Sequence, residues 1–90
     1  MFSITQFSSR LKEARIASGM TQKEIASELG IIQPAYNRFE RGKYQLNYEQ
    51  LFYVCNRFGV SADYLLGLED ETGAKIYQSG QYVIKQDQSK

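Results

Sequence analysis

The sequence predicts a compact all-α domain of five short helices over residues 1–67, followed by a C-terminal extension over residues 68–90. Two observations support the helices. Apolar residues recur every three or four positions in five stretches, which is the spacing of one face of a helix. Glycines, which commonly end helices, follow these stretches at Gly19, Gly30, Gly42, Gly59 and Gly67. Ninety residues suffice for one domain with a modest core.

Three of the helices are simple amphipathic elements. The first is expected to run from about Thr5 or Ser8 to Ser18. The fourth should begin after Asn47, which has capping-box spacing with the glutamine three positions later, and Ser61 should cap a short fifth helix. The apolar residues predicted to form the core are Leu11, Ile25, Leu29, Phe39, Leu51, Val54, Phe58, Val60 and Leu65.

The second and third helices are joined by a very short turn. Thr21 and Glu24 have the spacing of a capping box, so a helix should begin directly after Thr21. Gly30 can take the left-handed conformation that ends it. Pro34 is tolerated only in a first turn, so the third helix must start within a few residues of Gly30. The third helix is expected over residues 33–41, and its buried stripe should consist of Tyr36 and Phe39.

The outward face of the third helix combines amide and guanidinium groups and has no acid. It carries Gln33, Pro34, Asn37, Arg38 and Arg41. A short connection makes the two helices cross steeply, which leaves this face free to project. Such groups on a protruding helix are what reading base edges in a DNA major groove requires.

The segment TQKEIASELGIIQPAYNRFERGK, residues 21–43, resembles the helix-turn-helix of the lambda-repressor-like, Xre/Cro-type DNA-binding family. Residues 10–15 resemble the first helix of that family, and residues 51–67 resemble its last two helices. The resemblance covers about residues 7–67. The family's small residue, turn glycine and two later core positions correspond here to Ala26, Gly30, Tyr36 and Phe39.

Two residues depart from the family pattern. Ile32 stands where Ser or Thr usually caps the recognition helix, a loss of about 1 kcal/mol of capping that Pro34 partly offsets. Tyr36 replaces the usual Ile or Val, and its buried phenol needs a hydrogen-bond partner.

The resemblance implies a role for each exposed residue of this region. The residues implied to contact bases are Gln33, Pro34, Asn37 and Arg38. Those implied to contact phosphates are Gln22, Arg41, Lys43 and Tyr44. Arg15 and Glu40 match a largely buried ion pair of the family and are expected to be structural. Gln33 can hold adenine by N6 and N7, whereas Arg38 can read guanine or bind a phosphate.

The implied function is that of a DNA-binding transcriptional regulator, and a repressor in particular. The expected partners are double-stranded DNA and a second copy of the chain, with two half-sites about one helical turn apart. The alternative is an antitoxin-type protein that also binds a partner toxin through its extension. No cofactor is expected.

Composition excludes several other classes. The chain has no histidine and one cysteine, Cys55, so it offers neither a metal cluster nor a catalytic constellation, and we expect no enzyme.

Residues 1–67 hold eight Lys or Arg against six Asp or Glu, a modest positive balance. The absence of a long apolar run or a signal-peptide core leads us to expect a cytoplasmic protein.

The extension lies outside the resemblance. Residues 68–73 read as an acidic linker, residues 74–85 as a β-hairpin around Ser79-Gly80, and residues 86–90 as a frayed end. Three alternatives stay open for the hairpin segment: it pairs with a second copy, it docks on its own domain, or it is disordered.

Overall fold

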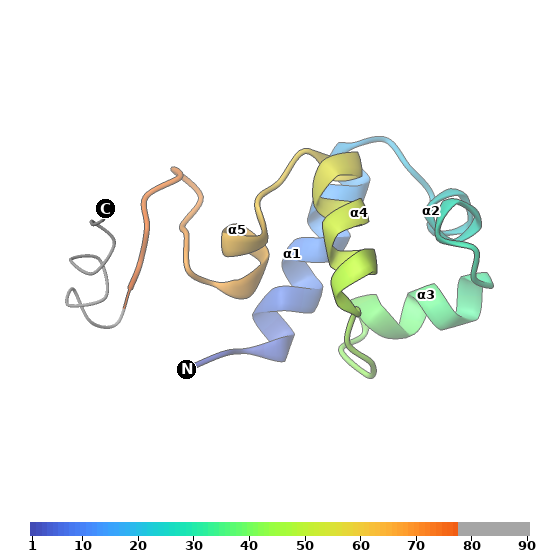
Figure 1. Cartoon of the computed structure of the whole chain (residues 1–90), viewed down its shortest axis with the longest axis horizontal. Helices are drawn as coiled ribbons and strands as arrows, with labels where there is room; N and C mark the ends of the chain where they lie inside the picture. The colour runs from blue at the N-terminus through green and yellow to red at the C-terminus, as the bar shows by residue number, and fades with distance from the viewer. Residues whose placement is uncertain (78–90) are drawn as a thin grey trace.

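The computed structural model describes residues 1–77, which form five helices and an isolated antiparallel bridge. The predicted all-α fold is confirmed. In chain order the helices are α1 (Ile4–Ala17), α2 (Gln22–Leu29), α3 (Gln33–Glu40), α4 (Tyr48–Phe58) and α5 (Ala62–Leu66). In the view of Figure 1, α2 and α3 lie at one end, α1 and α4 in the middle, and residues 68–77 at the other end. No helix within residues 1–77 is long and apolar enough to cross a membrane.

Local capping signals set the helix starts. The predicted capping box at α2 is present, with Thr21 N–H donating to Glu24 Oε1 at 2.9 Å and Glu24 N–H donating to Thr21 Oγ1 at 3.0 Å. Gly30 ends α2 at φ 73°, in the left-handed region that a glycine tolerates best. The predicted start of α1 was too late. Ser3 caps it, since its hydroxyl accepts the Gln6 N–H at 3.1 Å, and the helix therefore begins at Ile4.

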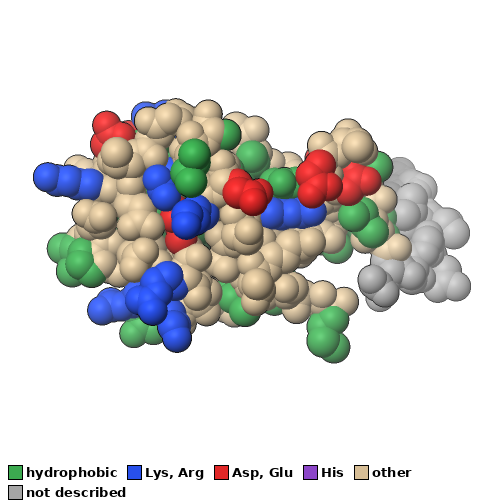
Figure 2. All heavy atoms as spheres, turned by 180° about the vertical axis from the view of Figure 1, so that it is seen from behind, with side chains coloured by type: hydrophobic (Ala, Val, Ile, Leu, Met, Phe, Trp, Pro, Cys, Tyr) green, Lys and Arg blue, Asp and Glu red, His purple; other side chains and the backbone are tan. Residues whose placement is uncertain are grey.

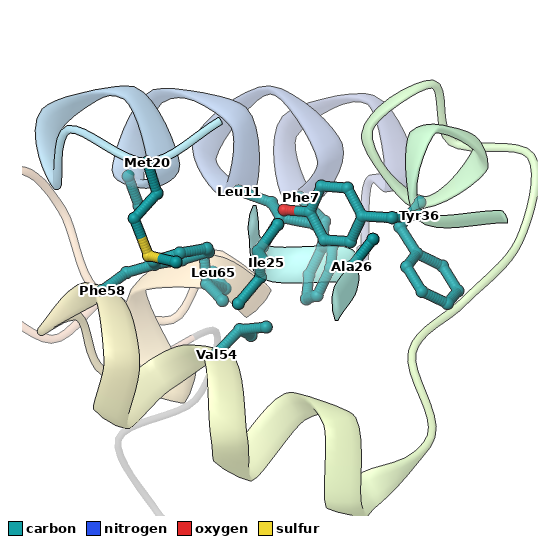
Figure 3. Close-up of a cluster of buried hydrophobic side chains, with 11 residues drawn as sticks. Phe7, Leu11, Met20, Ile25, Ala26, Tyr36, Val54, Phe58 and Leu65 are labelled. Atoms are coloured by element: carbon teal, nitrogen blue, oxygen red, sulfur yellow. The ribbon is translucent and has the colours of Figure 1, made fainter. Parts of the chain in front are cut away.

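The core lies where the five helices meet (Figure 3). Its fully buried large side chains come from all five helices and are Leu11, Ile25, Tyr36, Val54 and Leu65. Of the predicted core residues, Leu29, Leu51 and Val60 are only partly buried and pack against its edge. Met20, which no helical pattern identified, completes the core beside Phe58.

Arg10 fastens the residues after α5 to the first helix. Its guanidinium donates to the carbonyl oxygens of Tyr64 and Glu69, and it lies 4.1 Å from the centre of the Tyr64 ring. The predicted linker, residues 68–73, is a tight turn closed by the antiparallel bridge between Glu69 and Lys75. Most of the predicted hairpin, including its turn at Ser79-Gly80, lies outside the described residues.

Candidate nucleic-acid interface

Helix α3 presents the predicted base-reading residues at its surface. Gln33, Pro34 and Arg38 are exposed, and Asn37 is half-buried. Ile32 occupies the N-cap position and makes no side-chain capping bond, as its chemistry requires, while Pro34 lies in the first turn. The helix ends at Glu40, so Arg41 is its C-cap rather than its last helical residue.

The packing of α3 against α2 makes this face protrude. Ala26 of α2 is almost completely buried. Its side chain is small, and this lets the two helices approach closely. On the inner side of α3, the rings of Tyr36 and Phe39 meet edge to face with their centroids 5.9 Å apart. The inner face is thus fixed by aromatic packing, and the opposite face is left to solvent.

The exposed charge around α3 is positive. Within residues 33–45 the cations are Arg38, Arg41 and Lys43, all exposed, and the single acid, Glu40, is buried. Figure 2 shows basic side chains gathered at the end of the molecule that carries α3, with several acidic ones toward residues 68–77. A local basic surface of this kind attracts phosphate groups.

Tyr44 joins this basic surface through Arg38. The Arg38 guanidinium carbon lies 5.5 Å from the centre of the Tyr44 ring, and the backbone N–H groups of Lys43 and Tyr44 both donate to the Arg38 carbonyl oxygen, at 2.8 and 3.3 Å. The residues after α3 are therefore folded back onto its last turn, which keeps Lys43 and Tyr44 next to this helix.

Arg15 and Glu40 form an ion pair below this surface. Arg15 Nε donates to Glu40 Oε2 at 2.7 Å, its Nη2 donates to Glu40 Oε1 at 3.1 Å, and its Nη1 donates to the Met20 carbonyl oxygen at 2.8 Å. The two side chains are 10% and 2% exposed. Burial alone would raise the pKa of Glu40. The hydrogen bonds and charge of Arg15, the nearby Tyr36 hydroxyl and the Gln22 amide together outweigh it, so the pKa is lowered and the carboxylate stays ionised.

Gln22 joins the ion pair to Asn37 on α3, a connection that the sequence did not reveal. Its side-chain Nε2 donates to Asn37 Oδ1 at 3.1 Å and to Glu40 Oε1 at 2.9 Å. The amide group of Gln22 has two hydrogens, and both are engaged within the protein. A phosphate contact at Gln22 would therefore use the backbone N–H at the start of α2 rather than the side chain.

Tyr36 lacks the hydrogen-bond partner that the sequence led us to expect. Its hydroxyl is buried and makes no hydrogen bond within residues 1–77. Burial, and secondarily the nearby Glu40 carboxylate, raise the pKa of this phenol far above its ordinary value. The phenol is therefore neutral, and the packing of its ring, rather than a hydrogen bond, holds the side chain in position.

Cys55 shows no sign of activation. Burial raises the pKa of its half-buried thiol, and a thiol is a poor nucleophile until it ionises.

Comparison with known proteins identifies the family. A model of the helix-turn-helix family matches residues 11–65, which include every predicted DNA-contacting residue. The chain belongs to this family, of the Xre and lambda-repressor-like type.

Named bacterial relatives agree with the family assignment. The chain is 39% identical over 72 residues to the uncharacterized HTH-type transcriptional regulator YqaE of Bacillus subtilis, covering 80% of this chain and 60% of YqaE. It is 42% identical over 66 residues to the HTH-type transcriptional regulator ImmR of the same organism, covering 73% of this chain and 51% of ImmR. It is 31% identical over 65 residues to the HTH-type transcriptional activator BcrR of Enterococcus faecalis, covering 72% of this chain and 32% of BcrR. The helix-turn-helix chain thus spans 60% or less of each of these relatives.

Proposed function

We propose that this chain is a sequence-specific DNA-binding transcriptional regulator that inserts α3 into the major groove. The observation that carries this proposal is the outward face of α3. Gln33 and Arg38 are exposed there, and the only acid of residues 33–45 is buried in an ion pair. Amide and guanidinium groups discriminate base edges in the major groove, whereas an exposed acid would repel the phosphates.

Phosphate contacts on both sides of α3 would set its register. Arg41, Lys43 and Tyr44 follow the helix and are exposed. At the start of α2, the backbone N–H groups of Gln22 and Lys23 have no partner within residues 1–77, because the Thr21 cap takes the Glu24 N–H. Contacts of this kind orient a protein on the duplex without specifying sequence. The relatives' names, which describe transcriptional regulators, support the same proposal.

We further propose that the chain acts as a homodimeric repressor. A single α3 helix reads only a few base pairs. A second copy of the chain, bound one helical turn further along the same face of the DNA, would extend the site to a two-fold symmetric operator. A dimer placed over a promoter in this way would exclude other proteins from the DNA. An in vitro transcription assay on a promoter carrying the operator tests repression directly, since added protein should lower transcript yield; a rise would identify an activator.

The experiment that tests DNA recognition is selection from a pool of random duplexes with the purified 90-residue chain. The proposal predicts enrichment of an inverted repeat whose half-sites are about 10 base pairs apart from centre to centre. Enrichment of a single half-site would reject the dimer and keep base recognition. Recovery of the starting pool, with no enriched sequence, would reject the proposed function.

A further inference from the structure

Of the predicted base-reading residues, Asn37 is the one whose side chain makes a hydrogen bond within residues 1–77. Its Oδ1 accepts from Gln22 Nε2 at 3.1 Å. Its Nδ2 has no partner within residues 1–77, and it is not among the buried unpartnered atoms of that range. The two ends of the same amide group are therefore in different situations.

The buried carboxylate of Glu40 determines how the side-chain amides of Gln22 and Asn37 are oriented, that is, which end of each is the oxygen and which is the NH₂ group. An ionised carboxylate only accepts hydrogen bonds, so Gln22 must turn its NH₂ group, not its oxygen, toward Glu40 Oε1. The second hydrogen of that NH₂ group is then available to Asn37, and only the Asn37 oxygen can accept it. Amide oxygen and nitrogen are distinguished by their partners in this way. The charge of Glu40 therefore fixes the orientation of the Asn37 amide.

This orientation restricts what Asn37 can offer to a base. A bidentate contact with adenine needs the amide oxygen to accept from N6 while the nitrogen donates to N7. The Asn37 oxygen already accepts from Gln22, which leaves it one lone pair and turns it toward the start of α2, so the group presents mainly its nitrogen donor. A donor suits guanine, whose major-groove edge carries two acceptors, N7 and O6, and it opposes cytosine, whose edge carries a donor.

We propose that Gln22 is a positioning residue that sets Asn37 as a hydrogen-bond donor, so that Asn37 favours guanine over adenine at the base pair it faces. This inference rests on the proposed DNA-binding function and adds a specificity to it. Through Gln22, the buried pair of Arg15 and Glu40 takes part in base selection as well as in stability.

Two substitutions test the two halves of the inference by random-duplex selection. Asn37→Asp keeps an oxygen for Gln22 but replaces the outward donor with an acceptor, so the preferred base at one position should change from guanine to cytosine, by on the order of tenfold in relative affinity. Gln22→Met removes the donor that engages Asn37, so adenine should become accepted at that same position. Gln6→Met, at an exposed position of α1 beside Gly67, is the matched control and should leave the selected sequence unchanged.

The outcomes separate this inference from the proposed function. If the wild type enriches no sequence, the DNA-binding proposal fails. If the wild type enriches a site but no position responds to Asn37→Asp, or adenine is preferred at the responding position, the inference about Asn37 is overturned. An unchanged preference in Gln22→Met, beside a clear change in Asn37→Asp, overturns the positioning role of Gln22.

A measurement without DNA checks the bridge itself. In NMR spectra of the free protein, Asn37→Ala should shift the side-chain NH₂ resonances of Gln22 and leave those of Gln6 in place. Unshifted Gln22 resonances would show that the amide bridge does not exist in solution, and the inference would be withdrawn whatever the DNA experiment shows.

Discussion

The guanidinium of Arg15 on α1 holds the carboxylate of Glu40 at the end of α3 by two hydrogen bonds of 2.7 and 3.1 Å. The two residues are 25 positions apart in sequence, and neither side chain is more than 10% exposed. Because α3 also carries the proposed DNA-reading face, this pair joins the stability of the fold to the position of the recognition helix.

Arg15→Met should lower the free energy of unfolding by about 3–5 kcal/mol, because it leaves the Glu40 charge buried without its partner. Denaturant unfolding of the purified protein measures this. The double variant Arg15→Met/Glu40→Met should recover much of the loss, since it removes both charges together. Strictly additive losses in the double variant would show that the two charges do not interact.

Acid should remove the contribution of Glu40 to stability. The folded-state pKa of Glu40 lies below its ordinary value of 4.5, so the unfolded chain binds the proton more readily. The stabilisation is therefore complete above about pH 4.5 and is lost as the pH falls through the lower folded-state pKa. Glu28, Glu69 and Asp70 also have lowered pKa values, so the measurement is the difference between wild type and Glu40→Gln. The difference in free energy of unfolding between the two proteins should shrink as the pH is lowered from well above 4.5 to below the folded-state pKa of Glu40. A difference that does not change with pH would contradict the pairing.

Tyr36→Phe should leave the protein as stable as the wild type or raise its free energy of unfolding by up to about 1 kcal/mol, because the buried hydroxyl has no hydrogen-bond partner within residues 1–77. Tyr53→Phe is the contrasting variant, since the Tyr53 hydroxyl donates to Glu28 Oε1 at 2.7 Å, and it should not be stabilising. A clear loss of stability in Tyr36→Phe would show that the phenol bonds to its neighbour Glu40.

Lys43→Ala should weaken binding to specific and nonspecific duplexes equally, because we expect this residue to contact a phosphate. The slope of log affinity against log salt concentration should fall in magnitude by about one unit. Lys12→Ala, an exposed cation on α1, provides the control for a general change in net charge. A salt slope equal to that of the wild type would place Lys43 away from the DNA.

The helices could be predicted from the sequence because their start and stop signals are local. The capping box of Thr21 and Glu24 spans three residues, and the end of α2 depends on Gly30 alone. The predicted start of α1, at about Thr5 or Ser8, was one to four residues late, because Ser3 caps the helix and Ile4, three positions before Phe7, already packs against the core. Met20 was missed as a core residue because it lies between helices, where no periodicity identifies a buried face.

The candidate site could be predicted less completely. The resemblance to a known family named Gln22, Asn37 and Glu40 separately, but not the bonds among them. Those bonds join residues 15 and 18 positions apart and depend on how steeply α2 crosses α3, which no local pattern fixes. The contacts of Arg10 with Tyr64 and Glu69 were missed for the same reason, since 54 and 59 residues separate the partners.

The central claim is that α3 reads bases, and one comparison tests it most directly. The ratio of affinities for the selected duplex and a scrambled duplex is measured at one salt concentration for the wild type and for Gln33→Ala/Arg38→Ala. The account predicts that the wild type binds the selected duplex about a thousandfold or more tighter than the scrambled one. In the double variant, this preference should lose about 1–3 kcal/mol for each of the two base-reading side chains removed, while the helical fold stays intact. An unchanged ratio in the folded double variant would contradict the account, because sequence recognition would then lie outside the exposed face of α3.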